Sequence, residues 1–181
     1  FGRGGLMGGG VLPVMKHIPG HGRAMVDSHR ELPVVKATRA ELEACDFTTF
    51  AAMADLPMAM TAHVVYTALD KKQPATLSRT VIRSVIRNQI GFQGLLITDD
   101  LSMQALSGSM AEKARAAISA GCDMLLHCNG KLDEMLEVAA AAPLLKARAM
   151  SRARAALKLA RKPVRYDVKQ AERDWEAVQN P

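Results

Sequence analysis

Aromatic residues are scarce in this sequence: they make up 4% of its 181 residues and include a single tryptophan. A hydrophobic core must therefore be built mainly from alanine, leucine, valine, isoleucine and methionine. Hydrophobic residues reach 49% of the chain, which is enough for one domain with a substantial core. Because the methionine side chain fills irregular gaps, packing is the expected role of the 11 methionines.

Cysteine is also rare, with only Cys45, Cys122 and Cys128 in the chain and no CxxC motif. An odd number of cysteines argues against a framework of disulfides. Cys122 lies in an apolar run that is typical of a buried strand. We therefore expect free thiols in a reducing compartment, and we expect the protein to be cytoplasmic.

Long apolar runs are absent from the sequence. No stretch approaches the roughly 18–20 apolar residues of a membrane span, and nothing after Phe1 resembles a signal peptide. We expect a soluble protein that has no membrane partner. The chain begins with Phe1 and a glycine-rich stretch at residues 2–10. This beginning predicts that the chain was processed or is a piece of a longer protein.

Acidic residues are outnumbered by basic ones, which gives a net charge of +6, and much of the excess lies between Lys146 and Arg165. A basic segment of this kind can meet nucleic acid or an anionic membrane. This segment has no interleaved aromatic residues and has the pattern of an amphipathic helix with a solvated outer face. The sequence therefore predicts no nucleic-acid partner, and the charge could instead attract an anionic substrate.

Apolar runs alternate with amphipathic segments along the chain. The expected strands cover residues 11–15, 56–65, 94–98 and 122–127, and the expected helices cover residues 38–53, 77–90, 109–121, 132–142 and 144–161. Thr38 with Glu41, and Ser109 with Glu112, form the capping-box pattern that marks a helix start. Between the first strand and the first helix, residues 17–35 are expected to form a long ordered loop of functional importance.

This alternation indicates an α/β fold with parallel strands, because each crossover helix returns the chain to the same edge of the sheet. About four βα units are present, which is half of a TIM-like (β/α)8 barrel. An open doubly wound sheet would show the same alternation, so periodicity alone does not distinguish the two. Lys16 and His17 are expected to follow the first strand and Asp99 the third, which is where the active sites of barrels lie.

The first motif that could carry chemistry is Lys-His-Ile-Pro-Gly-His-Gly at residues 16–22. His17 and His21 are four residues apart, a spacing that would place both on one face of a helix and toward a metal ion. Pro19 and the glycines prevent a stable helix here, and no third ligand is obvious. A metal-dependent hydrolase that uses His17, His21 and Asp99 is nevertheless kept as an alternative hypothesis.

The second motif is Asp27-Ser28-His29. Adjacent residues cannot present an aspartate and a serine to opposite nitrogens of one imidazole, and the GxSxG signature of a serine hydrolase is absent. Asp27 and His29 alone could form a hydrogen-bonded pair that orients the imidazole for general acid–base catalysis. A loop-stabilising contact of the aspartate side chain explains the same spacing equally well.

The third motif is Asp99-Asp100, directly after an expected buried strand. An aspartate in this position could be a nucleophile, a metal ligand or the N-cap of the following helix. A carboxylate at the carboxyl end of a barrel strand favours a catalytic role, and Asp100 competes with Asp99 for it.

Together these motifs resemble glycoside hydrolase family 3. The matching segments are residues 16–22, 27–29 and 32–33, followed by Thr-Ala-His-Val at 61–64 and Ile-Thr-Asp-Asp-Leu-Ser-Met at 97–103. They occur in the family's order, and they are most similar to the cytoplasmic β-N-acetylhexosaminidases (the NagZ group) that recycle peptidoglycan in Gram-negative bacteria.

The resemblance implies a retaining β-N-acetylglucosaminidase that uses neither a metal nor another cofactor. Asp99 matches the family's nucleophile, His29 matches its general acid/base, and Asp27 matches the partner of that histidine. Lys16 and His17 match residues that hydrogen-bond the N-acetylglucosamine ring. The implied substrate is a small carbohydrate, N-acetylglucosaminyl-1,6-anhydro-N-acetylmuramic acid with or without its peptide, and the full-length enzyme is expected to be a monomer.

The resemblance runs from about residue 8 to about residue 160, so residues 1–165 are expected to form the C-terminal half of the catalytic barrel. Residues 166–181 are expected to be a polar tail. Family members have a further N-terminal stretch that supplies the first half of the barrel, and its counterpart is missing here. A non-catalytic sugar-binding remnant is therefore a second hypothesis. A phosphorylase that uses phosphate in place of water is a variant of the first.

Overall fold

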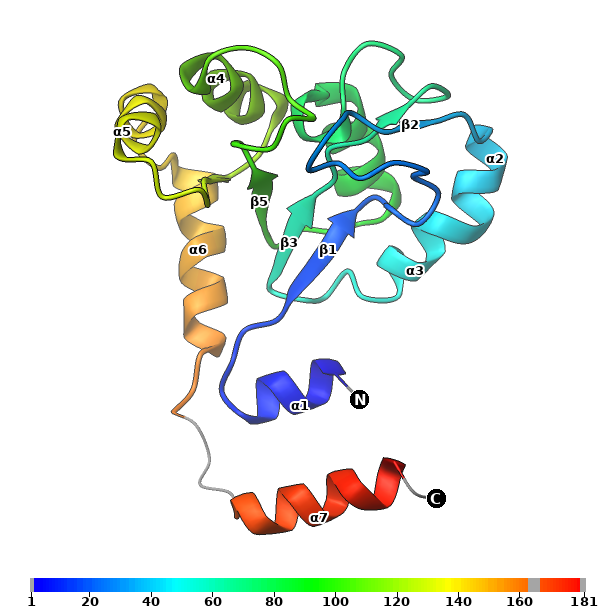
Figure 1. Cartoon of the computed structure of the whole chain (residues 1–181), viewed down its shortest axis with the longest axis vertical. Coiled ribbons are helices and arrows are strands. Elements are labelled where there is room, and N and C mark those ends of the chain that lie inside the picture. The colour runs from blue at the N-terminus through cyan, green and yellow to red at the C-terminus, as the bar shows by residue number, and fades with distance from the viewer. Residues whose placement is uncertain (1, 163–166, 180–181) are drawn as a thin grey trace.

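The fold is described from a computed structural model, in which residues 2–162 and 167–179 are described. Its central feature is a four-stranded parallel sheet with the order β1 (Val14–Ile18), β3 (Met58–Thr61), β5 (Leu95–Asp100) and β6 (Met124–Leu126). The strands shown in Figure 1 point the same way, so their carboxyl ends lie at one edge of the sheet. The α/β class with parallel strands is confirmed.

The order of the strands in the sheet is the same as their order along the chain. A doubly wound sheet would reverse its order at a switch point, whereas a barrel adds each new strand on the same side of the last. The sheet is therefore an arc of a TIM-like (β/α)8 barrel, with β1 and β6 at its two open edges. A separate two-stranded parallel sheet joins β2 (Val34–Val35) and β4 (Val65–Tyr66).

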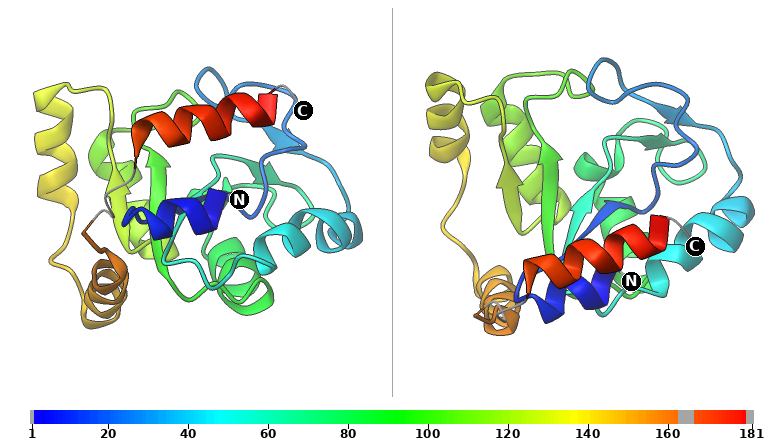
Figure 2. Two further views of the ribbon diagram at one scale, coloured as in Figure 1. Left: turned by 90° about the horizontal axis from the view of Figure 1, so that it is seen from below. Right: turned by 60° about the horizontal axis from the view of Figure 1, so that its bottom comes forward.

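Helices connect the strands. They are α1 (Gly2–Gly8), α2 (Arg39–Glu41), η1 (Leu42–Asp46), α3 (Phe47–Ala51), η2 (Ala75–Leu77), η3 (Val81–Gln89), α4 (Met110–Ala120), α5 (Leu132–Ala141), α6 (Ala147–Leu159) and α7 (Val168–Gln179). Both expected capping boxes are confirmed, at Thr38 and at Ser109. Figures 1 and 2 show that α1 and α7 lie beyond the amino ends of the strands.

Two of the expected strands were placed wrongly. The first begins and ends three residues later than expected, so Lys16 and His17 lie within β1 rather than after it. Their polar side chains suggested the end of a strand, but β1 is an edge strand of an open sheet and tolerates them. The strand expected at 56–65 is divided into β3 and β4, because the chain leaves the main sheet after Thr61.

The expected polar tail contains a helix, α7. The predicted boundary between residues 165 and 166 falls in 163–166, outside the described residues. Within 2–162 and 167–179, no helix has both the length and the apolar character that crossing a membrane requires.

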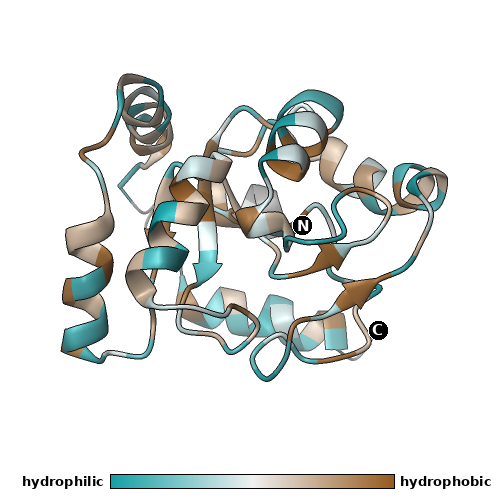
Figure 3. Ribbon diagram, turned by 90° about the horizontal axis from the view of Figure 1, so that it is seen from above, coloured by the Kyte–Doolittle hydropathy of each residue, from teal (hydrophilic) through white to brown (hydrophobic). Residues whose placement is uncertain are grey.

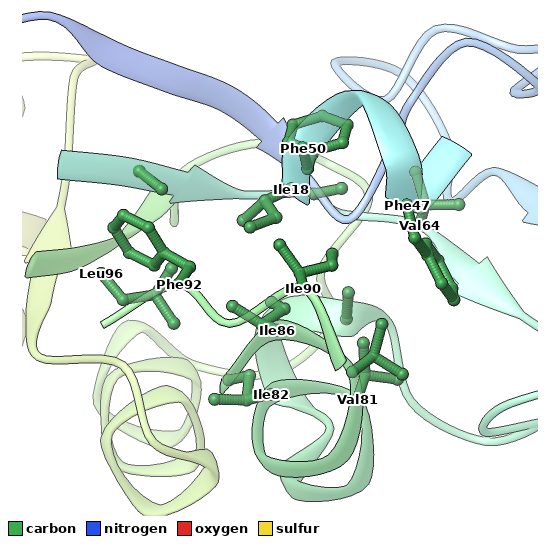
Figure 4. Close-up of a cluster of buried hydrophobic side chains, with 14 of the residues drawn as sticks. Ile18, Phe47, Phe50, Val64, Val81, Ile82, Ile86, Ile90, Phe92 and Leu96 are labelled. Carbon is green, nitrogen blue, oxygen red and sulfur yellow. The ribbon is translucent and has the colours of Figure 1, made fainter. Parts of the chain in front are cut away.

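One hydrophobic core lies between the sheet and the helices η3 and α3. Figure 4 shows Ile82 and Ile86 of η3 beside Phe92 and Leu96, with Phe50 of α3 on the other side of Ile18. The hydropathy colouring of Figure 3 shows helices with both apolar and polar patches, as amphipathic packing requires. Four of the aromatic residues, Phe47, Phe50, Tyr66 and Phe92, are buried in this core, whereas Trp175 of α7 is exposed.

The opposite face of the sheet is open. Alternate strand residues point away from η3, and register places Met60, Ile97 and Met124 in one row on that face. Val14 and Met124 are 36% and 39% exposed. In a closed barrel this face would point inward, so the sheet carries apolar side chains suited to an interior that the described chain does not enclose.

A buried carboxylate fixes the amino end of the sheet. Asp123 accepts hydrogen bonds from Arg87 at 2.8 Å, from Arg152 at 2.9 Å and from the backbone N–H of Leu96 at 3.0 Å. The same guanidinium of Arg87 donates to the carbonyls of Phe92 and Gly94. Asp123 therefore ties η3 and α6 to the start of β5, and the carboxylate and both guanidinium groups are largely removed from water.

We predict that Asp123→Ala lowers the free energy of unfolding by about 3 kcal/mol, because two partly buried guanidinium groups lose their counter-charge. Urea denaturation followed by circular dichroism measures the change. Glu31→Ala is the control: Glu31 is exposed and forms no ion pair with the described residues, so the expected change is within about 0.5 kcal/mol. Equal losses in the two variants would contradict the role of Asp123.

Candidate functional site

Asp99 lies at the carboxyl end of β5, at the edge of the sheet where all four strands end. The residue is 8% exposed, and its Oδ1 accepts the backbone N–H of Asp100 at 2.9 Å. Its Oδ2 lies 3.4 Å from Nε2 of His17, which comes from the neighbouring end of β1. One oxygen thus accepts a backbone hydrogen bond, and the other faces the imidazole of His17.

Asp100 is distinguished from Asp99 by its hydrogen bonds. Its carboxylate accepts from the N–H and hydroxyl of Ser102 and from the N–H of Cys128. Burial opposes ionisation, but these hydrogen bonds prevail and lower the pKa of Asp100. Asp100 therefore ties the tip of β5 to the segment after β6, which leaves Asp99 as the aspartate whose second oxygen is available for chemistry.

His17 is half-buried beside this carboxylate. Desolvation by burial lowers its pKa, and the opposing attraction of Asp99 does not cancel that effect. A neutral imidazole is thus favoured, and it can donate one N–H and accept one hydrogen bond. Lys16 precedes it on β1, and both residues line a cavity of about 330 Å³ with His21 and Asp46.

The loop after β1 carries Asp27 and His29. Oδ1 of Asp27 accepts from the backbone N–H of His29 at 2.9 Å and lies 2.7 Å from its Nδ1. These two contacts lower the pKa of Asp27, the backbone one most. The loop-stabilising contact and the oriented imidazole, which the sequence left as alternatives, are therefore present together. With Nδ1 held by the carboxylate, Nε2 of His29 is left to face a substrate.

The structure groups the candidate residues into two sets. His17 lies with Asp99 at the carboxyl ends of β1 and β5, with Lys16 before it on β1, whereas Asp27 and His29 form a pair on the loop. The side chain of His29 is 75% exposed, and no hydrogen bond or ion pair within residues 2–162 and 167–179 joins this pair to Asp99. Both sets belong to the same edge of the sheet, because the loop leaves the carboxyl end of β1.

His63 is a site residue to which sequence reasoning gave no role. Its side chain is fully buried between β3 and β5, with Nε2 3.0 Å from the carbonyl of Asp100 and Nδ1 2.7 Å from the hydroxyl of Thr76. A carbonyl can only accept, so Nε2 carries the hydrogen. Nδ1 of the neutral ring can then only accept, and it shares the single hydrogen of the Thr76 hydroxyl with the carbonyl of Ala62, which lies 3.0 Å from that hydroxyl. Thr61 is 2.8 Å from the same hydroxyl and completes the chain.

This buried chain of hydrogen bonds holds the backbone of β5 directly after Asp99. The available signal in the sequence was a histidine flanked by apolar residues near a strand end, which is also typical of an ordinary core histidine. Only the pairing of β3 with β5 brings His63 to the end of β5 that carries Asp99.

His17, His21 and Asp99 were considered as metal ligands. The rings of His17 and His21 are 5.6 Å apart and tilted by 58°, and Nε2 of His21 contacts Ser28 instead. Among the described residues, no three histidine, cysteine, aspartate or glutamate side chains are grouped as a metal site. The arrangement offers a carboxylate nucleophile and an imidazole acid/base, with hydrogen-bonding groups beside the carboxylate.

Comparison with known proteins gives a consistent result. Residues 4–161 match the family described as glycosyl hydrolase family 3 N terminal domain. A β-hexosaminidase of Alkalilimnicola ehrlichii is 45% identical over 129 residues, which are 69% of this chain and 37% of that protein. One from Tolumonas auensis is 42% identical over 132 residues, covering 70% and 39%. The chain thus spans less than two fifths of the length of these relatives.

Solved structures agree with the sequence matches. A family 3 β-N-acetylglucosaminidase from Paenibacillus superposes with a TM-score of 0.75 and 31% identity, over 88% of this chain and 34% of that one. NagZ from Neisseria gonorrhoeae, in complex with N-trifluoroacetyl-D-glucosamine, superposes with a TM-score of 0.69 and 32% identity, over 86% and 44%. The expected partial barrel is confirmed.

The buried histidines predict a dependence of stability on pH. Burial lowers the pKa of His63 from its ordinary value of 6.5, so the unfolded chain binds this proton more tightly than the folded one. The free energy of unfolding is therefore highest at pH values above the ordinary pKa of histidine. It falls on acidification below that pH, by up to about 1.4 kcal/mol per pH unit for each proton. His17 adds to the same slope.

Urea denaturation between about pH 7.5 and pH 5.5 measures this slope. His63→Gln removes one of the titrating groups, and the slope should decrease by up to one proton. Nitrogen NMR should find the ring of His63 protonated at Nε2 alone. An unchanged slope in the variant, or a doubly protonated ring at neutral pH, would contradict the assignment.

Proposed function

The chain belongs to glycosyl hydrolase family 3, and we propose that it supplies the catalytic residues of a retaining β-N-acetylglucosaminidase. The observation that carries the proposal is Asp99, a nearly buried carboxylate at the carboxyl end of a barrel strand with one oxygen uncommitted to the backbone. Such a group can attack a sugar carbon without first losing a shell of water. The relatives named β-hexosaminidase support the same reaction.

In the first step, Asp99 attacks the anomeric carbon and a bond forms between its Oδ2 and that carbon. The bond from the carbon to the leaving oxygen breaks, and that oxygen receives the proton from Nε2 of His29. Asp27 stabilises the imidazolium before the transfer, because its carboxylate holds Nδ1–H at 2.7 Å. The product of this step is a glycosyl ester of Asp99 and a free aglycone.

In the second step, neutral His29 takes a proton from water while the water oxygen attacks the same carbon. The ester bond to Asp99 breaks, and the sugar leaves with its original β configuration. An imidazole titrates close to neutral pH, so it serves as acid and then as base with less tuning than a second carboxyl group requires.

The residues at the ends of β1 and β5 and the residues on the loop after β1 have separate roles in this proposal. His17 lies beside Asp99, Lys16 lines the same cavity as His17, and both donate hydrogen bonds to the ring hydroxyls of the sugar. Asp27 and His29 sit on an exposed loop, so the acid/base reaches the glycosidic oxygen when that loop moves over bound substrate. Water is then excluded while the glycosidic bond breaks.

We further propose a substrate with a terminal β-linked N-acetylglucosamine on a muropeptide, released in peptidoglycan recycling in the cytoplasm. The sugar is supported by the N-trifluoroacetyl-D-glucosamine bound to the related NagZ structure. The location is supported by the free thiols of Cys45, Cys122 and Cys128.

Replacement of the nucleophile is the direct test. Asp99→Asn should lower kcat/KM for p-nitrophenyl N-acetyl-β-glucosaminide by roughly 10⁴-fold, because the amide cannot form the ester. A fluorinated substrate analogue whose ester is hydrolysed slowly should label the wild-type peptide that contains Asp99, detected by mass spectrometry. Asp100→Asn is the matched control and should not abolish labelling. Normal turnover by the Asp99 variant would end the assignment.

Replacement of the acid/base should depend on the leaving group. His29→Ala should slow cleavage of a disaccharide by roughly 10²- to 10⁴-fold. It should slow cleavage of the p-nitrophenyl glycoside much less in the first step, because p-nitrophenolate leaves without protonation. Equal losses on both substrates, measured as kcat/KM, would contradict the role of His29.

The same assays separate the alternatives. They are performed on the 181-residue chain and on the genomic reading frame that contains it. Binding of N-acetylglucosamine without turnover in both would favour a sugar-binding remnant. Loss of activity with a chelator would favour the metal-dependent hydrolase, and a sugar phosphate among the products would favour phosphorolysis.

A further inference from the structure

The amino end of the sheet carries a second cavity, of about 500 Å³, and five of its eleven lining residues are arginines. We refer to it as the arginine groove. Its arginines are Arg79, Arg83, Arg87, Arg148 and Arg152. Other hydrogen-bonding side chains in its lining are Asn88, Gln93 and Ser119, and the lining contains no carboxylate and no aromatic ring. The volume lies within the range of small-molecule sites.

The groove is remote from Asp99. Gln93 precedes β5 and Gly121 precedes β6, so the groove lies at the amino ends of these strands, whereas Asp99 lies at the carboxyl end of β5. The proposed glycosidase has no use for this cavity, and the inference below does not rest on that proposed function.

Two of the arginines are structurally committed. Arg87 and Arg152 bind Asp123 beneath the groove, and their side chains are only 11% and 16% exposed. Their guanidinium groups also donate to backbone carbonyls, which fixes their orientation. They provide a rigid, positively charged floor for the cavity.

The other three arginines are uncommitted. Arg79, Arg83 and Arg148 are exposed, and none forms an ion pair with a side chain in the described part of the chain. Arg83 is the third residue of η3 and Arg79 lies four positions before it, just ahead of that helix, whereas Arg148 is the second residue of α6 on the other wall. Five guanidinium groups thus lie near a single carboxylate, that of Asp123. The carboxylates of the described residues therefore do not balance the positive charge of the groove.

The amino end of α6 adds to this charge. Its N-cap, Lys146, makes no side-chain capping hydrogen bond, so this 13-residue helix leaves first-turn N–H groups without a cap beside Arg148. The helix dipole at this end favours an anion. Side chains and backbone therefore contribute in the same sense.

We propose that the arginine groove binds a small molecule that carries several phosphate groups. A guanidinium fork matches two oxygens of one phosphate, and several forks on opposite walls match a chain of phosphates better than a single one. The concave shape favours a small ligand over a duplex. The lining contains no aromatic ring on which a base could stack.

Inorganic triphosphate is the probe, and isothermal titration of the whole chain at about 0.15 M salt is the measurement. The double variant R83A/R148A should bind at least about tenfold more weakly, because each lost charge-assisted contact is worth about that factor. R83K/R148K keeps the charge but loses the fork, so its affinity should fall between the two. Neither variant touches Asp123, so the fold is expected to persist.

R154A/K158A is the matched control. It removes two positive charges from α6, but these residues line a different cavity, and binding should change by less than twofold. If the control loses as much affinity as R83A/R148A, or if R83K/R148K binds as tightly as wild type, net charge alone attracts the anion and the proposal is overturned. Asp99→Asn should keep wild-type affinity, so the two proposals fail independently.

Two further ligands identify the chemistry. ATP should bind no more tightly than triphosphate, because the proposed contacts are between guanidinium groups and phosphates and the lining has no aromatic ring; a tenfold preference for ATP would overturn the proposal in favour of a nucleotide site. Single-stranded DNA of about 5 to 20 nucleotides should bind more weakly than triphosphate. An affinity that rises steadily with strand length would overturn the proposal in favour of a nucleic-acid surface.

Discussion

The parallel alignment of β1, β3, β5 and β6 governs the arrangement of everything else in this molecule. Because the strands run in one direction, every segment that leaves a strand emerges at the same edge, and every segment that enters one starts at the other. His17, His63 and Asp99 are brought together for that reason alone. The same rule collects arginines from η3 and α6 at the opposite end.

Buried polar groups divide into two kinds within this frame. At the amino end, Asp123 is surrounded by donors and has no oxygen left for a ligand. At the carboxyl end, the chain from Thr61 through His63 ends on a backbone carbonyl next to Asp99, and the carboxylate itself keeps one oxygen unfilled by the backbone. At the amino end, every oxygen of the Asp123 carboxylate accepts a hydrogen bond, and these bonds hold the fold together. At the carboxyl end, the hydrogen bonds are made by the groups around Asp99, so its carboxylate stays in place while one of its oxygens accepts no backbone hydrogen bond.

Local signals in the sequence predicted the parts of the fold that depend on local physics. The two capping boxes, the positions of α4 and α5 and the strand before Asp99 follow from spacing of a few residues. The end of β1 was not predicted correctly, because Lys16 and His17 are polar residues inside a strand. Such residues are tolerated there because β1 is the edge strand of the described sheet. The roles of His63 and Asp123 depend on partners about 30 to 40 residues away, and no short window contains them. The resemblance to a family named five candidate site residues, and in the structure Asp27 and His29 lie on a loop apart from His17 and Asp99.

The ion cluster around Asp123 has a mechanical consequence. It clamps three elements at one end of the sheet through groups shielded from water, where dissolved salt weakens attraction little. At the other end, the side chains of Asp27 and His29 on the loop after β1 are 56% and 75% exposed. Backbone motion should therefore be smaller at the amino ends of the strands, where these buried ion pairs lie, than at the exposed Asp27 and His29.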